Sequence, residues 1–335
     1  MKVPLDGLRQ AVEAKLTQMG VPPDEAAVGA EMCLDAELRG HSSHGIRLLR
    51  PVAEEYANGA SRRGQLSVVD ESPVSARIDG GFHLSWFVHR TALDIAIGKA
   101  LSSGIAIVSV ANAGVSGALG YLVERMARAG LVGIALNSSP LTVVAPGTSV
   151  PSLGTNPIAV ALPRRAESPL VLDMATSAIA YNQVLRLREI GQRLPEGAAA
   201  DADGHVTTDP AAAIDPKTRR GRILPFGGHR GYGLSLMIEL MVSACVTGRA
   251  AADKRGPVFL EPADFSGLYI AYQPGLVGDP QAALDATERL VAELEDSGAR
   301  IPGEASRARR ARCLESGEVE VAQEALDLLD ALEGT

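Results

Sequence analysis

Strand-like and helix-like segments alternate along the middle of the chain, and this alternation constrains the fold more than any other feature. The apolar run GIAIVSV (104–110) precedes ALGYLVERMARAG (118–130), whose apolar residues recur at helical spacing, and a second apolar run, LVGIALN (131–137), follows. Two more apolar runs come at 157–163 and 169–175. Repeated alternation of this kind is typical of an α/β layer architecture.

The segments on either side of this region are mainly helical in pattern. Gly and Pro signals delimit three predicted helices before residue 60. A hairpin is predicted within 64–79, and further elements are expected as helices at 87–103, 231–248, 280–297 and 317–333 and a strand at 267–274. The long polar segment 191–227 has no sustained period, which leaves two interpretations: an ordered functional loop or a mobile lid.

Composition excludes several classes of protein. A net charge of −8 argues against nucleic-acid binding, which needs a concentrated basic surface. The start of the chain has no apolar signal segment, and the most apolar helical stretch is short and carries Glu239, so no contact with a membrane is expected. Cys33, Cys245 and Cys313 are far apart, which argues against disulfides and a zinc site. These features predict a cytoplasmic protein without a metal.

The glycines that follow the first of these apolar runs do not form a Rossmann fingerprint. Gly114, Gly117 and Gly120 lie in GVSGALG between a predicted strand and a helix, but their spacing is not G-x-G-x-x-G. The turn is either a tight connection or a cofactor-facing turn of another design. Neither interpretation supports a standard Rossmann domain.

The stretch RGHSSHGIR (39–47) joins two predicted helices and carries two histidines. A metal site would need a third ligand at a fixed spacing, and Ser43 with His44 lacks the G-x-S-x-G elbow of a serine nucleophile. Two interpretations remain for the imidazoles. They belong either to a polar turn, which is favoured for His41, or to a proton donor beside an anionic substrate, with Arg47 close by.

Three further segments have features of anion-binding sites. The turn containing Thr155 and Asn156 offers backbone amides that suit a carboxylate, or it is only a turn. In LDMATS, Asp173 ends an apolar strand, which suits either helix capping or cofactor binding. In LPFGGHRGYG, glycines flank His229 and Arg230 at a helix start, and this combination favours an anionic cofactor.

Taken together, these blocks resemble the malate/L-lactate dehydrogenase family of NAD(P)-dependent oxidoreductases. The resemblance rests on nine blocks in the same order over nearly the whole chain: RGHSSHG, GALGY, NSSP, GTNPIAVALP, DMATS, LPEG, DADGHVTTDP, LPFGGHRGYGL and IPGE. It implies an α/β, non-Rossmann NAD(P)-binding fold with a mixed sheet and a helical domain formed by both termini. It also implies a homodimer with active sites near the subunit interface.

The resemblance also implies roles for particular residues. His44 is expected to donate a proton to the substrate with Ser43 beside it, Arg47 to hold the substrate carboxylate, and Thr155 and Asn156 to contact the substrate. The expected NAD(P)H contacts, with NADPH slightly favoured, are Ser139, Asp173, Met174, Ala175, His229, Arg230, Gly231, Pro302, Gly303 and Glu304. The expected division is a helical substrate and dimerisation domain, 1–110 with 285–335, and an NAD(P)-binding domain, 111–284.

The chain departs from the family pattern at several positions. Val115 stands where relatives usually have a histidine, Arg230 stands where they usually have lysine, and the basic residue after the SHG motif is displaced to Arg47 and Arg50. A cyclic imine can arrive already protonated and needs less acid catalysis than a ketone. We therefore expect hydride transfer to C2 of a small carboxylic acid, favouring cyclic 2-imino over 2-oxo acids. The alternatives are a 2-hydroxy-acid dehydrogenase and a non-catalytic or divergent biosynthetic paralogue.

Overall fold

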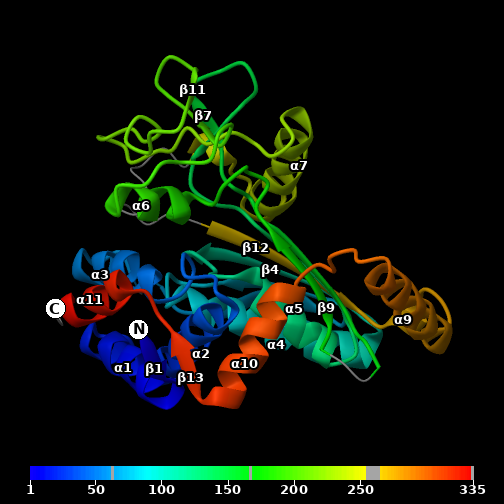
Figure 1. Cartoon of the computed structure of the whole chain (residues 1–335). Coiled ribbons are helices and arrows are strands. Elements are labelled where there is room, and N and C mark those ends of the chain that lie inside the picture. Colours follow the sequence, from blue (N-terminus) through cyan, green and yellow to red (C-terminus); the bar gives the residue numbers. More distant parts are fainter. Residues whose placement is uncertain (62–63, 166–167, 254–264, 333–335) are drawn as a thin grey trace.

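The centre of the molecule is a seven-stranded sheet with the order β2-β3-β4-β12-β5-β8-β9 (Figure 1). The computed structural model describes residues 1–61, 64–165, 168–253 and 265–332. The strands of the sheet are β2 (Ser67–Ser72), β3 (Ser75–Asp79), β4 (Ile105–Ala113), β5 (Val132–Asn137), β8 (Ile158–Leu162), β9 (Leu170–Met174) and β12 (Phe265–Tyr272). β3 and β4 are parallel and the other neighbours are antiparallel. The predicted mixed sheet is confirmed.

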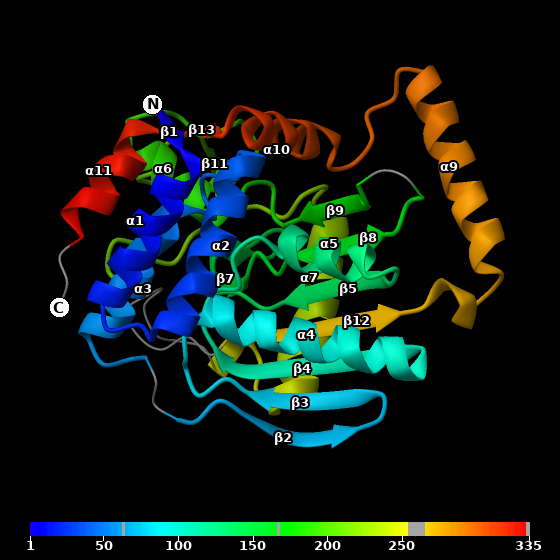
Figure 2. The same ribbon diagram turned by 90° about the horizontal axis from the view of Figure 1, so that it is seen from below.

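One face of the sheet is covered by α4 (Ser85–Ser103) and α5 (Leu119–Arg128), which lie in front of the strands in Figure 2. Leu122 and Met126 of α5 are fully buried in the main core, together with Ala135 of β5 and Ala159 of β8. Small residues on these strands let the helix approach closely. This packing fixes the turn that precedes α5.

The other face carries α7 (His229–Glu239), on the opposite side of the sheet from α4 and α5 (Figure 1). Ile238 and Val242 pack with Leu136 of β5 in a separate apolar cluster. A π-helical segment, Leu240–Ala244, joins α7 to the short α8 (Cys245–Thr247). The single helix predicted at 231–248 is thus interrupted by a π-helical segment.

The two ends of the chain form one layer. β1 (Lys2–Pro4) pairs with β13 (Glu318–Glu320), which places α1 (Leu5–Gln18), α2 (Pro23–Arg39) and α3 (Leu49–Ala57) beside α10 (Glu304–Ser316) and α11 (Gln323–Ala331). The helix predicted at 317–333 was wrong over its first residues, because Glu318–Glu320 pairs with a strand that lies far away in the sequence. Local periodicity does not report such a partner.

The remaining elements lie above the sheet or beside it. α6 (Tyr181–Glu189) packs on the segment 191–227, in which Leu194, Ala199 and Ile223 are buried with Val184. This segment therefore has its own core, as the ordered-loop interpretation predicts. The other elements are β6 (Val143–Val144), β7 (Pro151–Leu153), β10 (Ala199–Ala200), β11 (Val206–Thr207), α9 (Pro280–Asp296) and 3-10 helices at Ile46–Leu48, Ala251–Asp253 and Pro274–Leu276.

The sheet does not divide at the domain boundary expected between residues 110 and 111. That boundary falls inside β4, which pairs with β3 on one side and with β12 on the other. The division into two domains stays a prediction. Among the described helices, none combines the length and apolarity that a membrane span requires.

Candidate active site

A cavity of about 330 Å³ lies where the loops after α2, β4, β5 and β9 meet the start of α6. His44, Val115, Ser139, Asp173 and Tyr181 are among its lining residues and come from these five segments. None of the lining residues in the described part of the chain is Lys or Arg. A charged substrate group in this cavity therefore depends on hydrogen bonds from neutral donors and histidines.

His44 is held in the cavity wall by its neighbours. Its Nδ1 lies 2.8 Å from the Oγ of Ser43, and both residues line the cavity. Burial, with a smaller contribution from the nearby His41, lowers the pKa of His44 to about 4. The imidazole is therefore neutral at physiological pH before a ligand binds.

The loop that carries His44 is fixed by Glu37 of α2. Its Oε1 accepts a hydrogen bond of 3.0 Å from the backbone N–H of Ile46. A Cβ on Gly45 would lie 2.2 Å from this Oε1 atom, so only glycine allows the carboxylate to reach the loop. Glu37 therefore has a positioning role here.

His41 and Asp173 lie where the main cavity meets a smaller one of about 160 Å³. His41 Nε2 lies 3.1 Å from the Oγ of Ser306, and burial lowers its pKa. Asp173 accepts a hydrogen bond of 2.7 Å from the backbone N–H of Gly120, at the start of α5, although burial raises the pKa of its carboxyl. The structure thus places His41 at the site, and not only in a polar turn.

The expected cofactor residues fall into three groups. Ser139, Asp173, Met174 and Ala175 line the main cavity. Pro302 and Gly303 line the smaller one, where a Cβ on Gly303 would lie 2.6 Å from the carbonyl oxygen of Val171, and Glu304 accepts a hydrogen bond of 3.4 Å from the N–H of Ile301. The first two groups therefore follow one continuous path through His41 and Asp173.

The third group, at the start of α7, lies beside this path. His229 and Arg230 are exposed, whereas Gly231 is buried against Thr176, which follows Ala175 shortly after the end of β9. A Cβ on Gly231 would lie 2.3 Å from the carbonyl oxygen of Phe226 and 2.7 Å from that of Thr176. Glycine therefore lets the N-terminus of α7 pack against the residues next to the Asp173–Ala175 run.

The structure separates the expected substrate residues. Thr155 lines the main cavity, and its Oγ1 lies 3.0 Å from the Oγ of Ser139. Asn156 is fully buried: its Oδ1 accepts a hydrogen bond from the N–H of Ser139, and its Nδ2 donates to the carbonyl oxygen of Ser235 and to Glu239. Its amide is thus fully used within the protein. Asn156 positions Ser139, and contact with a substrate would require these bonds to break.

Arg47 points away from the main cavity. It forms an ion pair with Glu189, which also binds Arg50 at 2.8 Å. Both arginines line a second cavity of about 300 Å³, which shares Tyr181 and Asn182 with the main one. To hold a substrate carboxylate, Arg47 would have to release the carboxylate of Glu189 and bind the substrate instead. The expected anchoring role stays a prediction.

Several cavity residues were not found from the sequence. Asn182 donates a hydrogen bond of 3.2 Å to the carbonyl oxygen of Ser43, and Asn137 lies at the end of β5. Both line the main cavity. The NSSP block (137–140) does line the cavity, but nothing in its sequence pattern indicates that Asn137 as well as Ser139 lies in the cavity wall.

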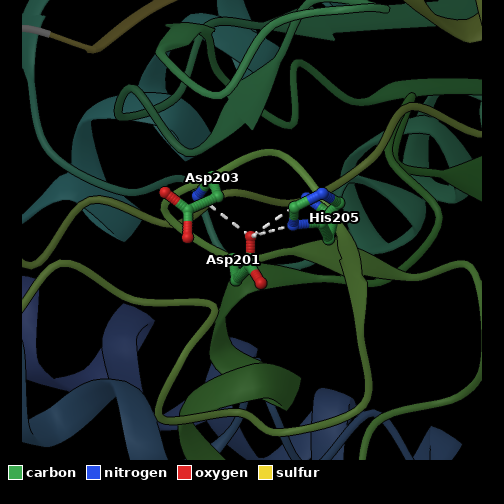
Figure 3. A group of neighbouring side chains, drawn as sticks. All are labelled: Asp201, Asp203 and His205. Atoms are coloured by element: carbon green, nitrogen blue, oxygen red, sulfur yellow. Dashed lines mark hydrogen bonds and ion pairs between the residues drawn. The ribbon is translucent and has the colours of Figure 1, made fainter.

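One acidic cluster lies outside these cavities, in the hairpin β10–β11 (Figure 3). The carboxylate of Asp201 accepts hydrogen bonds from the backbone N–H groups of Asp203 and His205, at 2.9 and 3.0 Å. Asp203 and His205 are exposed to solvent. The carboxylate of Asp201 therefore has a local role in closing the hairpin turn.

Comparisons with known proteins show which family and which solved structures the chain resembles. The sequence matches the family described as "Malate/L-lactate dehydrogenase" over residues 3–330. It is 33% identical to L-sulfolactate dehydrogenase of Methanothermobacter thermautotrophicus, covering 86% of this chain and 84% of that protein. It is also 33% identical to the Delta(1)-pyrroline-2-carboxylate/Delta(1)-piperideine-2-carboxylate reductase of Pseudomonas putida, covering 99% and 97%. The crystal structure of delta1-piperideine-2-carboxylate reductase from Pseudomonas syringae superposes with a TM-score of 0.87 at 32% identity, covering 99% of both chains.

Proposed function

The chain belongs to the malate/L-lactate dehydrogenase family and is an oxidoreductase, and from this premise we propose that it reduces C2 of a small 2-oxo or cyclic 2-imino carboxylic acid with NAD(P)H. One observation carries the proposal. His44 lies in the same cavity as Ser139 and the Asp173–Ala175 run, and the cavity continues past His41 and Asp173 to Pro302 and Gly303. An acid–base group and an elongated binding path thus meet in one place.

The residues present fit a dinucleotide. The path joins cavities of about 330 and 160 Å³ that share His41 and Asp173 in their walls, so one extended ligand can occupy both. Helix N-termini, which favour anions, lie beside it at α5 and α7, and Arg230 adds a positive charge. Ser139, Asp173–Ala175, Arg230 and Pro302–Gly303 would hold the cofactor. When bound, NAD(P)H supplies a hydride at C4 of its nicotinamide.

His44 would transfer the proton that accompanies the hydride. Reduction of a ketone puts negative charge on the substrate oxygen, and a protonated imidazole within hydrogen-bond reach neutralises it. In the reverse direction, the neutral imidazole accepts a proton from the hydroxyl of a 2-hydroxy acid. Ser43 at Nδ1 orients the ring in both directions.

The apolar side chain of Val115 favours a substrate that needs little further acid catalysis. It lines the main cavity at the position where the family usually has histidine, so an apolar side chain faces the ligand. A protonated cyclic imine is already electrophilic, and the similarity to pyrroline- and piperideine-2-carboxylate reductases supports it. The similarity to L-sulfolactate dehydrogenase supports the second candidate, a 2-hydroxy-acid dehydrogenase.

Substrate panels separate these candidates. Oxidation of NADPH and NADH is followed with pyruvate, oxaloacetate and Δ1-pyrroline-2-carboxylate as acceptors. We expect the highest kcat/KM with the imine, and a modest preference for NADPH. Turnover of the ketones alone would contradict the imine assignment. Tight cofactor binding without turnover of any acceptor would identify a non-catalytic paralogue.

We further propose that the protein is a homodimer. The outer face of α7 and of the π-helical segment exposes four large apolar side chains: Leu236, Met237, Leu240 and Met241. Contiguous exposed apolar side chains are typical of an interaction surface. A second copy of this chain is the partner that the resemblance implies.

A further inference from the structure

Asn137 has a buried amide group without a hydrogen-bond partner. The residue ends β5, is 2% exposed and lines the main cavity. Within the part of the chain that the structure describes, its Nδ2 atom has no partner. Asn156, also buried and nearby, uses both ends of its amide. Buried polar groups are almost always paired, so the free Nδ2 needs an explanation.

Two further buried residues lie at the other end of this amide. The hydroxyl of Tyr269 lies 2.6 Å from the Nδ1 of His89 and 3.5 Å from the Oδ1 of Asn137. Because the neutral His89 donates from Nε2 to the carbonyl oxygen of Gly114 at 3.4 Å, its Nδ1 accepts the hydroxyl proton of Tyr269, and the tyrosine oxygen packs against the amide of Asn137. Burial lowers the pKa of His89 to about 4 and raises the pKa of Tyr269, so the group of three is neutral.

The backbone leaves room for this arrangement at Gly267. This residue of β12 is paired with Asn137 of β5. A Cβ there would lie 3.1 Å from the Tyr269 hydroxyl, 3.2 Å from Asn137 Oδ1 and 3.2 Å from His89 Cε1. Glycine is therefore needed for the three side chains to meet behind the cavity.

We propose that Asn137 is a ligand-binding residue of the main cavity, whose Nδ2 donates a hydrogen bond to an oxygen of the bound ligand, and that Tyr269 and His89 are its positioning residues. The inference rests on the proposed function, because that function puts oxygen acceptors in this cavity. Two sources supply such an oxygen: the carboxylate or carbonyl group of the substrate, and the carboxamide of the nicotinamide. In the complex, Nδ2 gains the partner that it lacks in the free protein.

Variants at Asn137 test the proposal. Asn137→Ala removes the amide, and Asn137→Asp keeps its shape but replaces the donor by an acceptor. NADPH affinity is measured by fluorescence titration, and kcat and KM with the acceptor that the wild type reduces best. We expect a loss of about 10- to 100-fold with either variant if the oxygen belongs to a carboxylate, and of about 3- to 10-fold if it belongs to a neutral carbonyl or carboxamide. The loss falls on kcat/KM if the substrate supplies the oxygen, and on NADPH affinity if the carboxamide does.

The positioning role has its own readout. Tyr269→Phe removes only a hydroxyl and should impair the same parameter as Asn137→Ala, but less. The double variant should be no worse than Asn137→Ala alone, because Tyr269 acts through Asn137. Tyr272→Phe, at the other end of β12, is the matched control and should behave like the wild type. An additive effect of Tyr269→Phe would overturn the positioning role.

The outcomes also separate this inference from the proposed function. If folded Asn137→Ala and Asn137→Asp proteins keep NADPH affinity and kcat/KM within about twofold of the wild type, less than the loss of one hydrogen bond, the inference is wrong while the function stands. If the wild type binds NADPH but reduces no acceptor, the proposed reaction fails, and the NADPH titration of the variants alone decides on Asn137. A wild type that neither binds nor reacts overturns both.

Discussion

At the scale of single residues, the proposed chemistry depends on how burial lowers the pKa of the His44 imidazole. A pKa of about 4 means that the free enzyme holds a neutral ring above this pH. A neutral ring is ready to accept a proton, but it must first be protonated to donate one. The same residue therefore imposes opposite pH dependences on the two directions of the reaction.

The pH profiles of kcat/KM follow from this pKa. For reduction of a 2-oxo acid, kcat/KM should fall about tenfold per pH unit above about pH 4, as the imidazolium disappears. For oxidation of the 2-hydroxy acid it should be level above that pH. Initial rates between pH 5 and 8 in both directions check this. A reduction rate that rises with pH would exclude His44 as the proton donor.

Glu55 offers a second test at this scale, on stability. Burial, with a smaller contribution from the neighbouring Glu54, raises the pKa of this carboxyl to about 7. Since the folded state holds this proton more tightly than the unfolded chain, the wild type loses stability as the pH rises from about 4.5 to 7. Glu55→Gln avoids this cost and should gain about 3 kcal/mol over the wild type at pH 8 relative to pH 4.

Urea unfolding of both proteins at several pH values measures this difference. The advantage of Glu55→Gln should grow up to about pH 7 and then stay constant. A constant difference at all pH values would show that Glu55 ionises as easily in the folded state as in the unfolded chain.

The sequence predicted some of these residues better than others. The spacing in RGHSSHG and the family resemblance were enough to place His44 and Ser43 together. The partners of Arg47 and Asn156 could not be predicted, because Glu189 and Glu239 lie on helices far along the chain. Asn137 was missed because its distinguishing feature, a free buried amide, exists only in three dimensions.

At the scale of elements, the binding path depends on close approaches between backbones. Gly303, before α10, contacts the carbonyl oxygen of Val171 in β9 and thereby closes the smaller cavity. Gly231 lets α7 approach the end of β9 in the same way. These contacts join elements from three parts of the sequence around one ligand path.

A pair of glycines in the connection between α9 and α10 tests this role. Gly298 and Gly303 have nearly the same backbone conformation, with φ of 77° and 76°, but of the two only Gly303 would bring an added Cβ within 4 Å of another atom. Gly298→Ala should cost about 1 kcal/mol of stability, from backbone strain alone. Gly303→Ala should cost more and should weaken NAD(P)H binding, which Gly298→Ala leaves unchanged. Equal effects of the two variants on thermal unfolding and NAD(P)H titration would contradict the assignment.

Sequence periodicity predicted most elements but not those with distant partners. The central strands, α4 and α5 appeared where their apolar patterns indicated. β1 and β13 were missed because each is only three residues long and is stabilised by the other across the whole chain. The π-helical segment 240–244 also leaves no mark on a helical pattern.

At the scale of the whole molecule, one mixed sheet separates two layers with different roles. The layer with α2, α4 and α5 supplies His44 through the loop after α2, and the layer with α6 and α7 closes the site from the other side (Figure 1). The resemblance predicted the mixed sheet, but no local pattern gave its strand order. β12, which lies at its centre, comes more than 90 residues after β9.

Substitutions that introduce negative charge on the apolar face of α7 and the following π-helical segment test the proposed dimer. Met237 and Met241 are 55% and 40% exposed. Met237→Glu with Met241→Glu should convert the dimer to a monomer in light scattering after size exclusion, because buried unpaired carboxylates are costly at an interface. Val206→Glu, at an exposed site in the hairpin β10–β11, is the control. A wild type that is monomeric at micromolar concentration would contradict the proposal.

The cavity around His44 is the proposed site of NAD(P)H-dependent reduction. The most direct test is the oxidation of NADPH at 340 nm by the wild type and by His44→Ala, with equal NADPH saturation established by fluorescence. We predict turnover of at least one 2-oxo or 2-imino acid by the wild type, and a loss of about 10²- to 10⁴-fold in kcat for His44→Ala with a ketone. Unchanged turnover by His44→Ala would place the reaction elsewhere.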